Sequence, residues 1–388
     1  MKLSETPSGR APAAAESYWR AESPQEVRIP VAKPRLPSFA QIAPYLRRID
    51  ESGWYSNGGP LVQELERRLA ARAGGDAAHV ATVANATIGL TLALLAGDPP
   101  AGSLCMVPAW TFAASAHAVL LAGMMPWIVD VDEATGALQP AAARELLRDA
   151  PGPVGAVMPV SPFGAPVDPV PWESFREETG IAVVLDAAAA FDSIRASSLP
   201  AVVSLHATKV LGIGEGGFVV STDPSFIEEV QKRANFGFWN SREARVPSVN
   251  GKMSEYGAAV GLAGLDTWPE TRSDFARVAR AYRQELAGRD EIALPEGFGE
   301  SWVTSTVVAE SRQRNADEIA QALAERHFGS RRWWGGGLHR QAAFAKFPRR
   351  DLSHSEILAD SVLGLPCWRD LPNEEISRIC DAILSLSR

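Results

Sequence analysis

The stretch "SLHATKVLGIGEGGFVV", residues 204–220, holds the most informative pattern of the chain. It contains a G-x-G-x-x-G pattern that begins at Gly212, and Lys209 lies three residues before that glycine. A dinucleotide-binding fingerprint needs a strand before the glycines and a helix after them, because the helix N-terminus holds the pyrophosphate. Here the glycines lead into the apolar, β-branched run 218–222, which predicts a strand. The pattern therefore favours a tight reversal between two strands, with Lys209 beside it.

Short apolar strands alternate with helices around this stretch. The predicted strands are 104–108, 125–131, 154–160, 181–186, 201–205 and 217–222. Such a pattern indicates an α/β fold with a mainly parallel sheet that is covered on both faces. We predict a mobile N-terminal arm at 1–28, a large domain at 29–265 and a smaller C-terminal domain at 266–388. An arginine-rich helix at 270–288 leads into the C-terminal domain, and a helix at 373–386 ends it.

Composition places the chain among ordinary globular enzymes. Of its 388 residues, 46% are hydrophobic and 22% are charged, and the length allows two domains. The formal net charge of −8 argues against a nucleic-acid or anionic membrane surface. The three cysteines and six histidines lack metal or disulfide spacing, and no apolar run suits a membrane helix or signal peptide. We expect a cytoplasmic protein without a metal, a nucleic-acid partner or a membrane partner.

Two polar residues follow predicted strands, where sheets of this type bind ligands. Taken singly, Asp186 could cap the alanine run after it, and Lys209 could be an ordinary surface charge. Together they fit pyridoxal phosphate, because a lysine forms a Schiff base with an aldehyde cofactor and a carboxylate keeps a pyridine nitrogen protonated. The residues 85–87, Asn-Ala-Thr, begin a predicted helix, and a helix N-terminus attracts a phosphate group.

Nine stretches, in order along the chain, resemble the sugar aminotransferase family DegT/DnrJ/EryC1/StrS, within fold type I of the pyridoxal-phosphate enzymes. They are residues 54–70, 83–97, 107–132, 159–168, 183–193, 204–222, 235–241, 249–266 and 363–376. The resemblance implies an aminotransferase with a mainly parallel, seven-stranded type of sheet in the large domain and a smaller α+β domain at the C-terminus. It also implies that pyridoxal 5'-phosphate is the cofactor.

The resemblance assigns the cofactor site residue by residue. Lys209 corresponds to the family's Schiff-base lysine, which also moves a proton between cofactor and substrate. Asp186 corresponds to the carboxylate that pairs with the pyridine nitrogen. Ala86, Thr87 and Ser204 correspond to the residues that contact the phosphate.

Two further positions are implied in the same way. Phe112 corresponds to the aromatic residue that stacks on the cofactor ring, although an aromatic residue here could also belong only to the core. Asn250 corresponds to an asparagine that the family donates across a dimer interface. The resemblance therefore implies a homodimer with shared active sites.

The chain departs from the family's pattern at three positions. Ala189 stands where the family commonly has glutamine, and Ser161 and Phe163 replace a histidine and a tyrosine. A polar contact to the cofactor ring is therefore missing or supplied elsewhere. Some relatives carry histidine in place of the lysine and act as sugar dehydratases, and Lys209 argues against that branch.

The segment "RRWWGGGLHR", residues 331–340, fits two interpretations. Its arginines and the Trp333-Trp334 pair suit a sugar nucleotide, because guanidinium groups bind phosphate and indoles stack. A packed turn with solvated arginines suits the composition equally well. His206 similarly could face the cofactor or only hydrogen-bond within its turn.

The resemblance implies amino transfer, with glutamate as donor, to a nucleotide-activated keto-(deoxy)sugar. The alternatives are an aminotransferase for a non-nucleotide cyclic ketone such as a cyclitol, another pyridoxal-phosphate reaction on the same scaffold, and a cofactor-binding relative without turnover. The partners expected from the resemblance are the nucleotide sugar, the amino-acid donor and a second copy of the chain.

Overall fold

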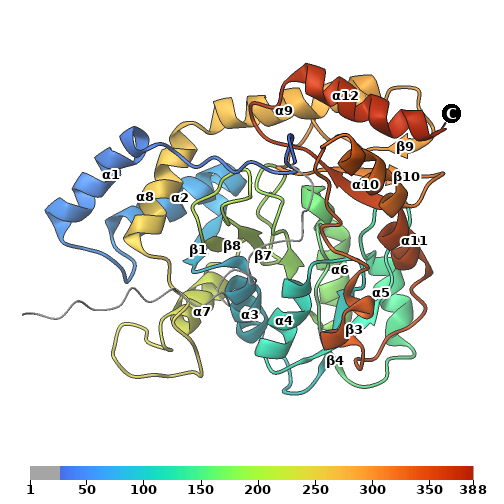
Figure 1. Cartoon of the computed structure of the whole chain (residues 1–388). Coiled ribbons are helices and arrows are strands. Elements are labelled where there is room, and N and C mark those ends of the chain that lie inside the picture. The colour runs from blue at the N-terminus through green and yellow to red at the C-terminus, as the bar shows by residue number, and fades with distance from the viewer. Residues whose placement is uncertain (1–26, 388) are drawn as a thin grey trace, which may run out of the picture.

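The computed structural model describes residues 27–387. All but the last two residues of the predicted N-terminal arm therefore lie outside the described part. A central sheet carries helices on both faces, and a second, smaller sheet lies beside the C-terminal helices (Figure 1). Within residues 27–387, no helix has both the length and the apolar character needed to cross a membrane.

One seven-stranded sheet organises the larger part of the chain. Its segments are β1 His79–Val83, β2 Leu104–Pro108, β3 Met125–Val129, β4 Val154–Val157, β5 Ala182–Val183, β6 Leu185–Asp186, β7 Ala201–Ser204 and β8 Gly217–Ser221. β5 and β6 are halves of one strand, since the amide of Asp186 still donates to Pro159 beyond the end of β4. The order is therefore β3-β2-β4-β5/β6-β7-β8-β1. β8 runs antiparallel to both neighbours and the other adjacent pairs are parallel, which confirms the predicted fold.

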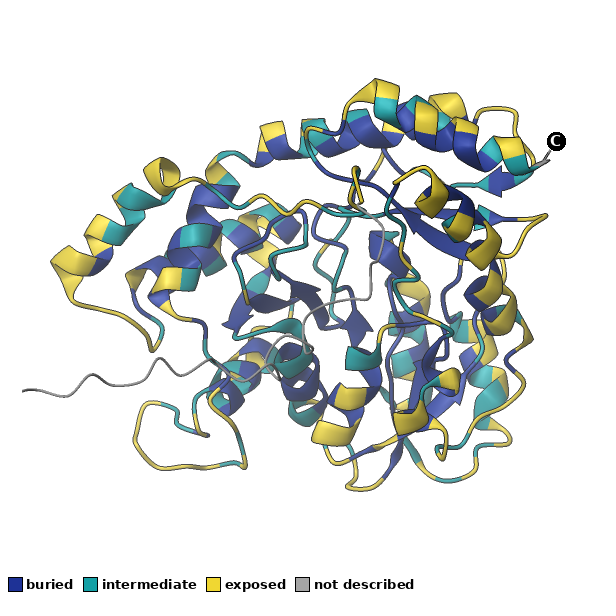
Figure 2. Cartoon of the chain, in the orientation of Figure 1, coloured by how far each residue is buried: buried dark blue, intermediate teal, exposed yellow. Residues whose placement is uncertain are grey.

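The helices of this part bury apolar faces against the sheet. They are α1 Phe39–Ser52, α2 Pro60–Gly74, α3 Ala86–Ala96, α4 Ala113–Leu121, α5 Pro140–Leu147, α6 Val170–Thr179, α7 Pro224–Ala234 and α8 Glu255–Asp266. α3 lies so close to the sheet that a Cβ at Gly89 would be 2.8 Å from the side chain of Val202. The sides of α3 that face away from the sheet are also apolar, and they pack against α4 and α7. Buried residues accordingly form a continuous layer between helices and strands (Figure 2).

The C-terminal part packs a three-stranded antiparallel sheet against helices. Its elements are α9 Trp268–Glu285, β9 Ile292–Ala293, β10 Val307–Ser311, α10 Ala316–Glu325, α11 Ser353–Ser361, β11 Val362–Leu365 and α12 Asn373–Leu384. The predicted helices at 270–288 and 373–386 correspond to α9 and α12. The described chain begins beside this part, where the amide of Ile29 donates to the carbonyl of His327. The division at residue 265 stays a prediction.

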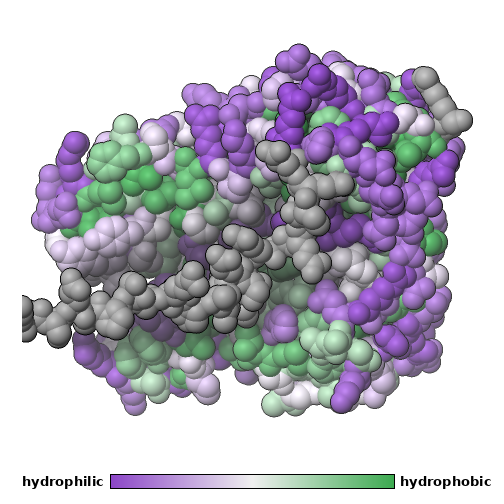
Figure 3. All heavy atoms as spheres, viewed as in Figure 1, coloured by the Kyte–Doolittle hydropathy of each residue, from purple (hydrophilic) through white to green (hydrophobic). Residues whose placement is uncertain are grey.

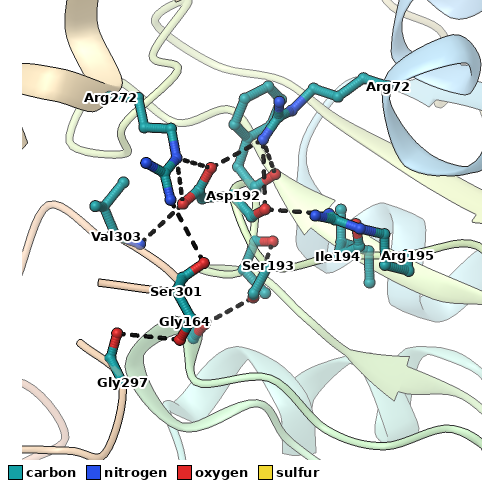
Figure 4. A network of polar contacts seen from close by, with 12 residues as sticks. Arg72, Gly164, Asp192, Ser193, Ile194, Arg195, Arg272, Gly297, Ser301 and Val303 are labelled. Carbon is teal, nitrogen blue, oxygen red and sulfur yellow. Dashed lines mark hydrogen bonds and ion pairs between the residues drawn. The ribbon is translucent and has the colours of Figure 1, made fainter. Parts of the chain in front are cut away.

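A buried carboxylate ties the two parts together (Figure 4). Asp192 is 4% exposed, and it accepts hydrogen bonds from Arg72 of α2 and Arg272 of α9 at 3.1 and 3.0 Å. It also accepts from the amide of Val303 at 3.0 Å. The guanidinium of Arg72 lies over the rings of Phe191 and Trp268, 4.7 and 4.8 Å from their centroids. This cluster, Asp192 with its two arginines and Val303, fixes the segment that leads into β10.

Candidate active site

A cavity of about 460 Å³ opens at the carboxyl ends of the parallel strands. Six of the seven predicted site residues line it: Ala86, Thr87, Phe112, Asp186, Ser204 and Lys209. They come from the ends of β6 and β7, from the reversal between β7 and β8, from the start of α3 and from the residue before α4. The sheet topology thus gathers residues that are up to about 120 positions apart in the sequence.

Lys209 lies in the reversal that joins β7 to β8. Its amide donates to the carbonyl of His206 at 2.8 Å, which begins a turn. The chain reverses through Gly214, whose φ of +101° is a conformation that favours glycine. The glycines then enter β8 and not a helix, so the dinucleotide-binding interpretation is wrong. Their function is to close the reversal that presents Lys209.

Asp186 ends β6 and is 5% exposed. Its Oδ2 accepts from the hydroxyl of Ser115 at 2.7 Å, and its Oδ1 accepts from the amide of Ala188 at 3.2 Å. The Ser115 hydroxyl also lies 2.9 Å from that of Thr111. Since Ser115 is wholly buried in α4, this relay holds the carboxylate in one orientation.

Burial perturbs both ionisable groups. Desolvation raises the pKa of Asp186, while the bonds from Ser115 and Ala188 and the charge of Lys209 lower it. Desolvation lowers the pKa of Lys209 and the charge of Asp186 opposes that shift. Part of the Lys209 side chain is accessible from the cavity. Desolvation of its amine shifts the group in the direction of the neutral form, which is the nucleophilic one.

The N-terminus of α3 forms an open cradle for an anion. Asn85 caps the helix by accepting from the amide of Ile88 at 2.9 Å. No hydrogen bond within the described chain uses the amides of Ala86 and Thr87, which lie at the start of the helix. A Cβ at Gly217 would lie 3.0 Å from the Ala86 amide nitrogen, so glycine keeps this side of the cradle clear. Backbone amides and the helix dipole make such a cradle suitable for phosphate.

Ser204 and Phe112 border the same space. Ser204 is the last residue of β7, and its hydroxyl accepts from the amide of His206 at 3.2 Å. Phe112 is 58% exposed and faces the cavity, so it is not a core residue in the single chain. An exposed aromatic ring beside a cavity is available to stack on a planar ligand.

The three departures from the family pattern form a wall that is poor in polar groups. Phe163 stacks on Trp334 with 3.9 Å between ring centroids and 15° between planes. Its backbone φ of +51° is unusual for a bulky residue. The hydroxyl of Ser161 is used within its own turn, where it donates to the carbonyl of Ala165. Ala189 lines the cavity and presents only a methyl group.

Part of the segment 331–340 borders the cavity, as the sugar-nucleotide interpretation requires, and part of it is a packed turn. Arg331 lines the cavity with its guanidinium 4.9 Å from the Trp333 ring centroid, and no ion pair within residues 27–387 involves it. Arg332 instead pairs with Asp317 at 2.5 Å, and His339 is buried outside the cavity. The first arginine and the tryptophans thus border the site, whereas the rest of the segment is packed structure.

His206 combines both predicted roles. It lines the cavity, its Nδ1 lies 2.9 Å from the Thr208 hydroxyl, and its Nε2 lies 3.7 Å from a carboxylate oxygen of Glu215. Asn250 is the exception among the predicted residues. It is exposed and does not line the cavity, and its side-chain oxygen accepts from Lys252 at 2.8 Å.

Sequence reasoning did not single out several residues of the site. Thr111 lies two residues before α4, and Ser115 lies in the first turn of that helix. No local signal indicates that Asp186, 71 positions beyond Ser115, is their partner. Ser305 and Thr306 also line the cavity, two and three residues after Val303, whose amide donates to Asp192.

These groups fit pyridoxal phosphate. The cavity offers an amine for the aldehyde, a buried carboxylate for the ring nitrogen and an anion cradle with unused amides for the phosphate. Together with the strand order, they define a fold type I pyridoxal-phosphate enzyme.

Comparison with known proteins gives the family. The model of the DegT/DnrJ/EryC1/StrS aminotransferase family matches residues 39–384, and the chain belongs to that family. The dTDP-4-amino-4,6-dideoxy-D-glucose transaminase of Shigella dysenteriae is 28% identical over 365 residues, which cover 91% of this chain and 97% of that relative. The chain is accordingly a pyridoxal-phosphate-dependent aminotransferase.

Solved structures agree with this assignment. DesI, determined in the presence of its TDP-sugar product, has 31% identity and a TM-score of 0.83, with 94% of this chain and 95% of DesI covered. DesV from S. venezuelae has 26% identity and a TM-score of 0.80, with coverages of 92% and 99%.

Proposed function

We propose that this aminotransferase transfers the amino group of glutamate to a nucleotide-activated keto-(deoxy)sugar. The observation that carries the proposal is the convergence of Lys209, Asp186 and the open start of α3 on one cavity. When bound, the cofactor supplies an electron-accepting ring and carries the amino group between the two substrates. Residues of the chain bind and orient the cofactor and transfer protons.

Each residue has a defined task in this proposal. The Nζ of Lys209 would hold the cofactor covalently, and once free it would carry a proton to or from the substrate carbon. The carboxylate of Asp186, oriented by Ser115, pairs with the ring nitrogen. The amides at Ala86 and Thr87, together with the hydroxyls of Thr87 and Ser204, would hold the phosphate. Phe112 would stack on the ring. Because donor and acceptor use one cavity in turn, the kinetics are ping-pong.

The nucleotide-sugar assignment rests on relatives and on the cavity. The relative from Shigella dysenteriae is named for a dTDP-sugar, and DesI was solved with a TDP-sugar. In this chain, the guanidinium of Arg331, which forms no ion pair within residues 27–387, suits a phosphate group. The half-buried indoles of Trp333 and Trp334 line the same cavity and suit contact with a base or a sugar ring.

A homodimer completes the proposed site. Exposed aromatic residues gather around α1 and α8: Trp54, Tyr55 and Tyr256 are 49%, 54% and 49% exposed. Figure 3 shows hydrophobic surface on the side of the molecule that carries these two helices. Burial of such a surface favours association. In the dimer, Asn250 reaches the cofactor phosphate of the neighbouring subunit.

A substrate panel tests the proposed reaction. The protein saturated with pyridoxal phosphate is incubated with glutamate and with nucleotide keto-sugars or cyclic ketones, and products are identified by mass. We expect a gain of one amine on a nucleotide sugar and formation of 2-oxoglutarate. Lys209→Ala abolishes the reaction, whereas Lys346→Ala, which removes an exposed lysine outside the cavity, leaves it unchanged. Amination of cyclitol ketones alone would overturn the nucleotide-sugar assignment.

A further inference from the structure

A second cavity, of about 870 Å³, lies on the other side of Phe163 from the active site. It is bounded by the loop after β3, the loop at 162–165, the strands β9 and β10, and α11. These elements lie together on the right of Figure 1, where the C-terminal sheet meets the large sheet. Phe163 borders both cavities, so an occupant of the second cavity touches the wall of the first.

Carboxylates dominate the charge of this second cavity. Asp132, Glu133, Glu296 and Glu310 line it, and Arg312 is the one cation among its lining residues. None of the four carboxylates forms an ion pair with another residue of the described chain, in contrast to Asp192. Burial raises the pKa of Glu310, and the charge of Glu133 raises it further, while Arg312 opposes both effects. Four carboxylates and one guanidinium therefore leave a net negative charge around this cavity.

The floor of the cavity is apolar. Trp110, Phe163, Val308 and Leu358 are buried residues of one hydrophobic cluster, and all of them line the cavity. Ser361, at the end of α11, also lines it, is nine-tenths buried, and has a hydroxyl without a hydrogen-bond partner in the described chain. A buried hydroxyl of this kind costs free energy unless a ligand or water pairs with it. The site thus combines an apolar floor, an unused hydroxyl and an acidic rim.

We propose that this cavity binds an organic cation, an ammonium group on an apolar or ring-shaped body. A metal ion does not fit, because no three His, Cys, Asp or Glu residues between 27 and 387 are grouped to hold one. A nucleotide diphosphate does not fit either, since four carboxylates repel its phosphates. An ammonium ion is stabilised by dispersed carboxylates at the rim while its apolar body covers the floor.

Calorimetric titration of the holoenzyme with benzyltrimethylammonium tests the proposal. This quaternary cation cannot condense with the cofactor, and 2-methyl-1-phenyl-2-propanol is its neutral near-isostere. We expect saturable binding of the cation, weakened by added salt, and at least tenfold weaker binding of the alcohol. Equal affinities for the two compounds, or no saturable binding of the cation, overturn the proposal.

Variants locate the binding to the cavity. Glu310→Gln and Glu133→Gln each keep the size of the side chain and remove one negative charge. We expect each to weaken the affinity for the cation roughly three- to tenfold and to leave the affinity for the alcohol unchanged. Glu318→Gln removes an exposed carboxylate of α10 outside the cavity and leaves both affinities at the wild-type value. Wild-type affinity in both cavity variants contradicts the assignment. These experiments measure binding and not turnover. Their outcome therefore does not depend on which acceptor the enzyme aminates.

Discussion

Replacing Asp192 should destabilise the protein strongly, because one carboxylate satisfies three donors from separate elements (Figure 4). Asp192→Ala leaves two arginine side chains, 24% and 36% exposed, and the buried amide of Val303 without their acceptor. Breaking a buried charge pair costs about 3–5 kcal/mol. Since both arginines keep some contact with water, we expect the lower end of that range, about 3 kcal/mol. Asp192→Asn keeps an oxygen for the amide and costs about 1–2 kcal/mol.

Urea unfolding of the holoenzyme, followed by circular dichroism, measures these changes. Glu318→Gln is the matched control, because it breaks the exposed pair with Arg314, 3.4 Å apart, and should cost below about 1 kcal/mol. Asp192→Ala should lower the free energy of unfolding most, Asp192→Asn less, and Glu318→Gln least. If Asp192→Ala unfolds at the same urea concentration as Glu318→Gln, the cluster does not join the two parts of the chain.

Three other predictions concern the carboxylate of Glu66 in α2, the carboxylate of Asp186 that is proposed to pair with the cofactor ring, and the proposed dimer. Burial raises the pKa of the Glu66 carboxyl to about 6, so the folded protein binds a proton at this group more tightly than the unfolded chain does. The stabilisation that results is fully present below about pH 4.5 and is lost as the pH rises through about 6. Glu66→Gln should therefore gain about 2 kcal/mol relative to wild type between pH 4.5 and 7.5 in urea unfolding, and a pH-independent difference would refute the shift. Asp186→Asn should keep the covalently attached cofactor, seen by absorbance, and lose most of its turnover; an unchanged rate would return Asp186 to a capping role. Inactive Lys209→Ala and impaired Asn250→Ala subunits should regain part of their activity when mixed under conditions of subunit exchange, and a fully active monomer in sedimentation would contradict the shared site.

The strands and the position of Lys209 in a reversal between two of them were predictable because local patterns specify them. Apolar runs bounded by turns gave six strands of the large sheet, and the strand-forming residues after Gly217 excluded a helix there. β1 was not predicted, since His79–Val83 is short and mixes polar with apolar residues. The antiparallel pairing of β8 with β7 follows from the reversal around Lys209.

The remaining parts of the site depend on contacts between distant segments. The bond from Ser115 to Asp186 joins α4 to β6, and the stacking of Phe163 on Trp334 joins residues 171 positions apart. Neither contact leaves a periodic signal in the sequence, because each is a single pair that the packing of whole elements creates. The role proposed for Asn250 requires a second chain, so neither local pattern nor single-chain packing specifies it.

Locating the covalently bound cofactor tests the central claim most directly. The purified holoenzyme is reduced with borohydride and digested, and the modified peptide is sequenced by mass spectrometry. We predict one phosphopyridoxyl group for each chain, attached to Lys209, and its loss when the enzyme is incubated with glutamate before reduction. A group on another lysine, or an unmodified Lys209 in protein saturated with pyridoxal phosphate, would contradict the account.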